Sequence, residues 1–220
     1  MYEWLKKLVS DGNTLKPTFE HFTKMIVDGR HMFDLAANAL LTGMAVESVR
    51  NDLFETDRKI NLAEQKIRRE ILVHASVRGA QDFPTCLVLM SISKDAERIG
   101  DYCKNIFDLA LTRPLDPTGS MGKELMKVKD DVSRLLGHLV TVYTSQDEEG
   151  ATQILHETDA IEDTCDKHVA ELVRDPSQGG AEAVSAALAW RHLKRITAHA
   201  KNIVTSIVMP VDKLDFFDEP

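Results

Sequence analysis

Apolar residues recur at alternating steps of three and four through most of this chain, and that spacing constrains the fold more than any other feature. In the stretch 17–41 the apolar seam consists of Phe19, Phe22, Ile26, Gly29, Phe33, Ala36 and Leu40. Such steps put apolar side chains on one face of an α-helix. No stretch shows the sustained alternation of period two that marks a β-strand. The sequence therefore predicts an all-α protein whose long helices pack through apolar seams.

The seam and its interruptions predict six long helices. They are expected at about residues 17–41, 45–77, 83–111, 123–145, 148–174 and 181–209. Five of the six carry the three-four steps, which suit helices that pack at shallow angles. Asp82 precedes Phe83 and Pro84, an order that predicts a helix N-cap with proline in the first turn. The stretch 112–122 contains two prolines and two glycines, which makes it the best linker in the chain.

The two halves of the chain are related in sequence. Residues 54–57 (FETD) are matched by residues 156–159 (HETD), and residues 97–106 (ERIGDYCKNI) by residues 194–203 (KRITAHAKNI). An offset near one hundred residues, with three helices in each unit, indicates a tandem duplication of a three-helix bundle. We therefore predict two antiparallel three-helix bundles, at residues 13–112 and 121–210.

Composition and charge narrow the functional class. The chain has 220 residues, of which 43% are hydrophobic, and its net charge of −8 argues against a nucleic-acid partner. The cysteines Cys86, Cys103 and Cys165 are scattered, so we expect small core residues in a reducing compartment rather than disulfides or a zinc site. No run approaches the roughly eighteen apolar residues of a membrane span, so we expect no membrane insertion. Residues 1–9 lack a signal-peptide core and are interpreted as a short amphipathic docking helix.

Polar oxygen-bearing side chains form stripes beside the apolar seams. On the second helix the stripe consists of Asp57, Asn61 and Glu64, and on the third helix it consists of Glu97, Asp101, Asn105 and Asp108. Residues three or four apart are neighbours on a helix surface, so each stripe gathers its oxygens on one side. Clustered carboxylate and amide oxygens are what hard cations bind. The alternative is a solvated acidic face that binds nothing.

The duplicated unit resembles the PhoU family of phosphate-signalling regulators. The resemblance is carried by the Glu-Arg-Ile-Gly-Asp-x-x-x-Asn-Ile string at residues 97–106 and by the Asp-x-x-x-Asn-x-x-Glu spacing at residues 57–64. It covers nearly the whole chain after residue 13. It implies two PhoU domains, a cytoplasmic location and a homodimer. It also implies a non-enzymatic adaptor that contacts a phosphate transporter, ABC-type or other, a sensor histidine kinase, or both.

The resemblance further implies metal clusters on the carboxylate stripes. Carried over by position, the first site consists of Asp57, Asn61, Glu64, Glu97, Asp101 and Asn105. All six are oxygen donors, so Mg²⁺, Mn²⁺, Ca²⁺ or iron would suit this site better than a thiolate-seeking metal.

The second half departs from this pattern. It offers Asp159, Asp163 and Asp166 on the fifth helix, but the counterparts of Glu97 and Asp101 on the sixth helix are Lys194 and Ala198. The sixth helix keeps Asn202 and adds His192 and His199. We hypothesise that Lys194 takes the place of a metal there and neutralises Asp159 and Asp163. The rival hypothesis is that His192 or His199 joins the acids in a softer metal site.

Two other functional classes remain as alternatives. A di-metal carboxylate enzyme needs Glu-x-x-His pairs that face a bundle core, and no such pair occurs in the sequence. A metal-free helical scaffold needs no ligand set at all, because acidic stripes are common on exposed helices.

Overall fold

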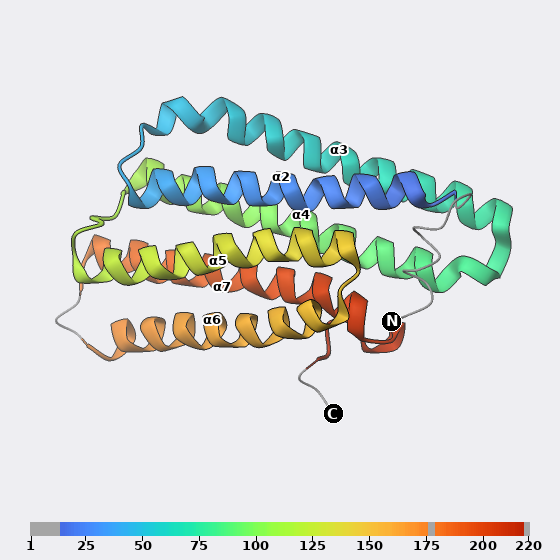
Figure 1. Ribbon diagram of the computed structural model, residues 1–220. Helices are drawn as coiled ribbons and strands as arrows, with labels where there is room; N and C mark the ends of the chain where they lie inside the picture. The colour runs from blue at the N-terminus through green and yellow to red at the C-terminus, as the bar shows by residue number, and fades with distance from the viewer. Residues whose placement is uncertain (1–13, 176–178, 218–220) are drawn as a thin grey trace.

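The computed structural model describes residues 14–175 and 179–217, and within those ranges every long element is an α-helix (Figure 1). The helices are α2 (Lys16–Leu41), α3 (Val46–Arg78), α4 (Phe83–Thr112), α5 (Ser120–Ser145), α6 (Glu148–Arg174) and α7 (Ala181–Val208). Short 3-10 turns occupy η1 (Gly79–Asp82) and η3 (Val211–Lys213). The prediction of an all-α fold is confirmed. The expected docking helix at residues 1–9 lies outside the described residues.

Helix α5 begins at Ser120, inside the stretch predicted as linker. The linker turns tightly instead of running to residue 122, because Asp116 accepts hydrogen bonds from the backbone N–H and the hydroxyl of Thr118, at 2.8 and 2.7 Å. Gly122 makes this turn possible, since a Cβ at that position would lie 1.9 Å from the carbonyl oxygen of Asp116. The other helices begin and end within one residue of the predicted bounds, and α6 matches them at both ends.

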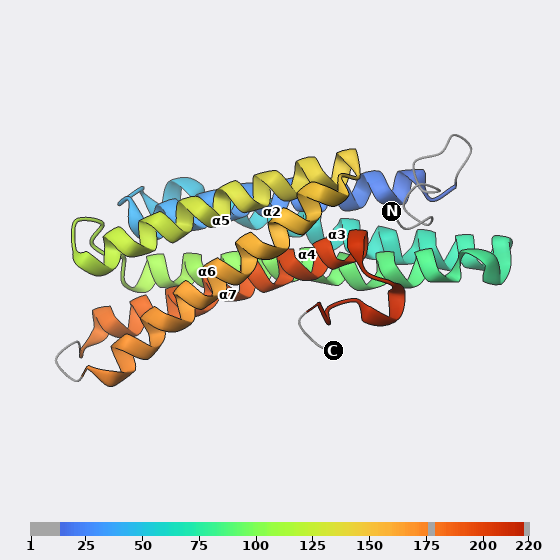
Figure 2. The ribbon, with the colours of Figure 1, turned by 60° about the horizontal axis from the view of Figure 1, so that its bottom comes forward.

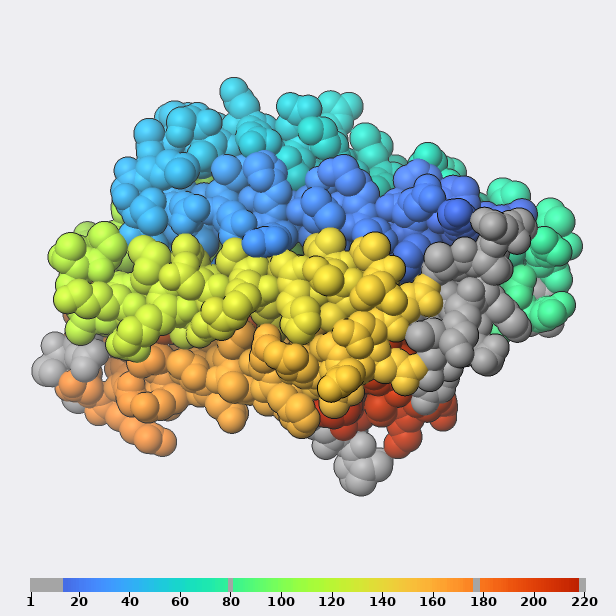
Figure 3. All heavy atoms as spheres, in the orientation of Figure 1, coloured from blue at the N-terminus to red at the C-terminus, as the bar shows by residue number. Residues whose placement is uncertain are grey.

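The six helices form two three-helix bundles that lie side by side. Helices α2, α3 and α4 make up the first bundle, and α5, α6 and α7 the second (Figures 1 and 2). The bundles meet where α4 packs on α7 and α2 packs on α5, and Figure 3 shows α2 and α5 in contact along much of their length. Helices α3 and α6 lie on opposite outer sides (Figure 1). Each outer helix therefore packs mainly on its own bundle, while α4 and α7 belong to both the bundles and their interface.

The apolar core is continuous across the boundary between the bundles. Tyr143 of α5 is fully buried and packs its ring against Phe19 and Phe22 of α2, at centroid distances of 5.4 and 4.9 Å. All three cysteines are free and buried. Burial raises the pKa of the Cys165 thiol to about 12, with Asp166 and Glu162 contributing. The thiol is therefore protonated at neutral pH and packs as a small apolar group.

Asp82 occupies the predicted N-cap position of α4, but its side chain makes no capping hydrogen bond. Its carboxylate instead lies 2.9 Å from Nε2 of His74, whose Nδ1 lies 2.7 Å from the hydroxyl of Thr14. His74 is 6% exposed, and a buried imidazole needs partners for both of its nitrogens. That requirement draws the Asp82 side chain away from the helix terminus.

Candidate functional site

The first acidic stripe is organised around a lysine. The ammonium of Lys104, on α4, lies 2.9 Å from Asp57 Oδ1 on α3 and 2.8 Å from Asp101 Oδ1 on α4. Asn61 donates to Asp57 Oδ2 at 3.2 Å. Burial lowers the pKa of Lys104, but the hydrogen bonds to Asp101 and Asp57 outweigh burial and raise that pKa above its ordinary value. Lys104 is therefore charged at neutral pH and bridges the two helices.

The remaining acids of this stripe also have basic neighbours. Glu64 Oε1 accepts from Arg68 at 2.5 Å, and Glu97 Oε2 accepts from Lys94 at 2.6 Å. Burial raises the pKa of Glu64, and although Arg68 and Lys94 oppose this, the repulsion of Glu97 and Asp101 adds to it. The acids on α3 and α4 are thus close enough to repel one another, and side-chain cations limit that repulsion.

Asn105 lies at one edge of the stripe. Its side chain is exposed and lines an open hollow of about 380 Å³, whose lining also includes Asp101 and Lys104. The structure therefore brings Asp57, Asn61 and Asp101 together around Lys104, and Asn105 lies beside them along the hollow that Asp101 and Lys104 also line.

As the side chains are placed, the first stripe fits an ammonium group better than a metal ion. Within residues 14–175 and 179–217 no group of three or more His, Cys, Asp or Glu side chains is arranged to hold a metal. Lys104 occupies the space between the carboxylates of Asp57 and Asp101. A metal ion bound by these two acids would have to displace that ammonium. The metal site stays a prediction, and it now includes displacement of the Lys104 ammonium by the bound metal.

The second acidic stripe is also held by lysines, but not in the way that the sequence suggested. Lys201 of α7 donates to Asp159 of α6 at 2.7 Å, and Lys194 pairs with Asp166. The hypothesis that Lys194 neutralises Asp159 and Asp163 is corrected: its partner is Asp166. The alignment of the two repeats contained the missing signal, because Lys201 occupies the position of Lys104.

Three candidate residues of α7 contact the first bundle rather than the acids of α6: His192, His199 and Asn202. His199 Nδ1 lies 2.8 Å from Asp95 Oδ1, and Asn202 donates to the same oxygen at 3.0 Å. The ring of His192 packs against Tyr102 with a centroid distance of 5.8 Å. The rival hypothesis had these histidines joining the α6 acids, but they lie in the seam between α4 and α7. Sequence reasoning missed Asp95 because that residue belongs to neither acidic stripe.

The seam between α4 and α7 shows the duplication directly. In the repeat alignment Asp95 corresponds to His192, and Tyr102 corresponds to His199. The contact of Asp95 with His199 and the contact of Tyr102 with His192 are therefore equivalent pairs, related by exchange of the two halves. Each half contributes one member of each pair. Duplication thus placed polar residues at the interface between the bundles, where they hold the two halves in register.

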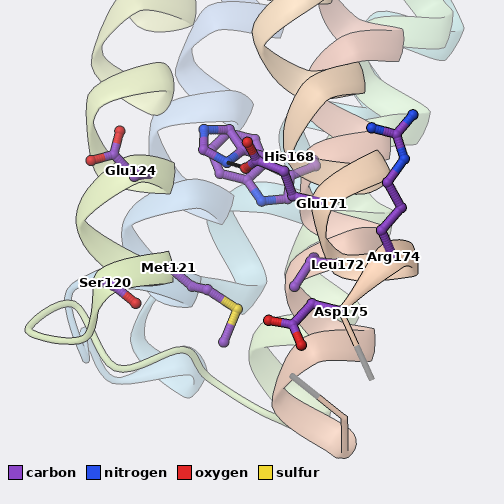
Figure 4. Close-up of a pocket in the computed structure, with 9 residues that line it drawn as sticks. Ser120, Met121, Glu124, His168, Glu171, Leu172, Arg174 and Asp175 are labelled. Atoms are coloured by element: carbon purple, nitrogen blue, oxygen red, sulfur yellow. Dashed lines mark ion pairs between the residues drawn. The ribbon is translucent and has the colours of Figure 1, made fainter. Parts of the chain in front are cut away.

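A larger hollow of about 450 Å³ lies at one end of the second bundle (Figure 4). His168 stacks on Trp190 with a centroid distance of 4.4 Å and pairs with Glu171 at 3.3 Å. Figure 4 shows Ser120 on the α5 side of this hollow, apart from His168. Nucleophilic catalysis by serine needs a base within hydrogen-bond reach. In the part of the chain that the structure describes, the hollow does not pair Ser120 with His168 in that way.

Together these features define a class of protein: a duplicated three-helix bundle in which lysines bridge acidic residues between the second and third helices of each bundle. The model of the PhoU domain matches this chain twice, over residues 22–110 and 125–207. The chain therefore belongs to the PhoU family.

Named relatives and solved structures agree with this assignment. The chain is 26% identical to a phosphate-specific transport system accessory protein PhoU homolog from Synechocystis sp., over 70% of this chain and 68% of the relative. A protein of the same description from Xylella fastidiosa is 22% identical, over 86% of this chain and 82% of the relative. The crystal structure of PhoU from Pseudomonas aeruginosa superposes with a TM-score of 0.78 at 21% identity and covers 89% of this chain and 95% of that one. The crystal structure of the phosphate transport system regulatory protein PhoU from Streptococcus pneumoniae superposes with a TM-score of 0.71 at 17% identity. It covers 93% of this chain and 97% of that one.

Proposed function

We propose that this chain is a non-enzymatic regulator of phosphate transport that acts in the cytoplasm by contacting other proteins. The observation that carries the proposal is the pair of PhoU domains, one in each half of the chain. The relatives from Synechocystis and Xylella, described as accessory proteins of phosphate-specific transport, support the same role. No helix among residues 14–175 and 179–217 is long and apolar enough to span a membrane. A regulator of transport would then reach a transporter by docking on it.

The proposed partners are a phosphate transporter and a sensor kinase that responds to phosphate, with the regulator acting as a homodimer. The structure supports a binding role through its architecture, because long rigid helices present extended side-chain surfaces. The metal site on α3 and α4 is a separate proposal that the regulatory role does not require. If metal binds there, it replaces the ammonium of Lys104 and links α3 to α4.

A deletion strain tests the regulatory role. Removing the gene should raise phosphate uptake or change phosphate-responsive transcription, and the wild-type chain supplied on a plasmid should restore both. The matched control is a plasmid that encodes a chain truncated after residue 112, which lacks the second PhoU match. If uptake, polyphosphate and phosphate-responsive transcription are all normal in the deletion strain, the proposed function is wrong.

A further inference from the structure

An apolar groove opens where the chain enters helix α2. It has a volume of about 350 Å³, and we call it the α3 groove. It is lined by Thr14, Pro17, Arg69, Glu70, Val73, His74, Val77 and Arg78. Val73 and Val77 are one helical turn apart on α3 and are 65% and 78% exposed. Two neighbouring valines this exposed in an apolar groove form a surface that another apolar face can cover.

The groove lies where the N-terminal segment joins the described part of the chain. Thr14 is both a lining residue and the first described residue. Its hydroxyl lies 2.7 Å from Nδ1 of the buried His74, and Leu15 beside it is 1% exposed. These contacts hold Thr14, to which residues 1–13 are covalently joined, against the wall of the groove. The segment is therefore tethered beside the groove at a high effective concentration.

The segment has the pattern and the length to cover the groove. Its apolar residues Met1, Trp4, Leu5 and Leu8 have the spacing of one helical face. A helix formed by residues 1–9 would be about 14 Å long, and α3 extends about 14 Å from Arg69 to Arg78. Residues 10–13, Ser-Asp-Gly-Asn, have the composition of a turn and can span at most about 14 Å.

We propose that residues 1–9 fold back onto the α3 groove as an amphipathic helix and bury Trp4, Leu5 and Leu8 against Val73 and Val77. The occupant is this chain's own segment, since the tether at Thr14 lies in the groove and the segment's helical length equals the length of the groove. The proposal is independent of the regulatory function and would stand if that function were wrong.

Trp4 provides the readout. The chain has two tryptophans, and Trp190 is 1% exposed, so subtracting the signal of Trp4→Phe isolates Trp4. In the wild-type chain Trp4 should be shielded from acrylamide. Val77→Asp should increase quenching of Trp4 several-fold and shift its emission to the red, and Leu5→Asp should do the same from the other side of the contact.

The chain offers a matched control for the groove substitution. Val173 on α6 is 79% exposed, nearly the same as Val77, and does not line the groove. Val173→Asp should leave Trp4 shielded, and circular dichroism should show equal helix content in both aspartate variants. If Val77→Asp and Val173→Asp give equal quenching, the proposal is wrong.

Two further measurements distinguish other occupants. Shielding that increases with protein concentration would show that a second copy fills the groove, and it would overturn docking within one chain. Shielding of Trp4 that requires vesicles containing anionic lipid would show that a membrane surface is the target, and it would overturn the proposal as well. Shielding that is independent of concentration, needs no vesicles and is lost in Val77→Asp is the expected result.

Discussion

The two halves of this molecule share a fold but differ in how they balance their acidic residues. Both use a lysine at the equivalent position of the third helix to reach an equivalent aspartate on the second helix: Lys104 reaches Asp57, and Lys201 reaches Asp159. They differ about two turns earlier, where the first half has Glu97 and the second has Lys194. Lys194 pairs with Asp166, whereas Glu97 adds a further negative charge near Glu64.

This comparison separates the acidic residues that both halves pair with a lysine from the acidic residues that occur only in the first half. The Asp–Lys pair occurs in both halves, so it needs no ligand to explain it. Glu97 and Asp101 are additional acids of the first half, since the equivalent residues of the second half are a lysine and an alanine. An excess of carboxylates on one bundle is where a bound cation would relieve repulsion. The first half is therefore the place to look for metal.

The largest expected effect concerns metal binding. Lys104→Met removes the ammonium that competes for Asp57 and Asp101, so binding of Mn²⁺ should tighten at least about tenfold, which corresponds to about 1.4 kcal/mol. Isothermal titration calorimetry measures this, with Lys201→Met as the matched control in the second half. Glu97→Ala combined with Asp101→Ala should abolish binding. Equal affinity in all four proteins would show that the first stripe is not a metal site.

The next effect concerns stability in metal-free buffer. Lys104→Met leaves Asp57 and Asp101 facing each other without a cation, and we expect a loss of about 2 kcal/mol in the free energy of unfolding. Lys201→Met removes the lysine from Asp159, whose side chain is 42% exposed and can be solvated, so the expected loss is about 1 kcal/mol. Urea unfolding at neutral pH measures both. A larger loss for Lys201→Met would reverse the proposed ranking of the halves.

The smallest effect is a pH dependence at the seam between the bundles. Burial, together with Arg191, lowers the pKa of His192, which packs on Tyr102 near Arg195. The unfolded chain therefore binds a proton at His192 more readily than the folded chain, and this stability is lost as pH falls through the ordinary histidine pKa of about 6.5.

His192→Gln should remove this contribution. Between pH 7.5 and 5.5 the variant should lose less stability than the wild type, by a few tenths of a kcal/mol to about 1 kcal/mol. Urea unfolding at the two pH values measures the difference. The exposed His156 provides a control, since His156→Gln should keep the wild-type pH dependence. A wild-type pH dependence in His192→Gln would contradict the proposed role.

Local periodicity was sufficient to predict the helices but not the partners of polar side chains. The seam on α2 is buried as predicted, because apolar spacing along one helix determines which face packs. The pairs Lys201–Asp159 and Asp95–His199 join residues 42 and 104 positions apart. Such contacts depend on how helices rotate against one another, which one helix's pattern does not determine. The repeat alignment could have predicted Lys201 from Lys104, but only after one of them had been placed.

The central claim is that equivalent lysines hold equivalent aspartates in the two halves. Double-mutant cycles test it directly, using Asp57→Asn with Lys104→Met in the first half and Asp159→Asn with Lys201→Met in the second. Unfolding free energies at neutral pH in metal-free buffer should give a favourable coupling in both halves, about 0.5–2 kcal/mol, and larger for Asp57–Lys104. Coupling energies of zero within error in both cycles would contradict the account, because the lysines would then contact the aspartates without holding them.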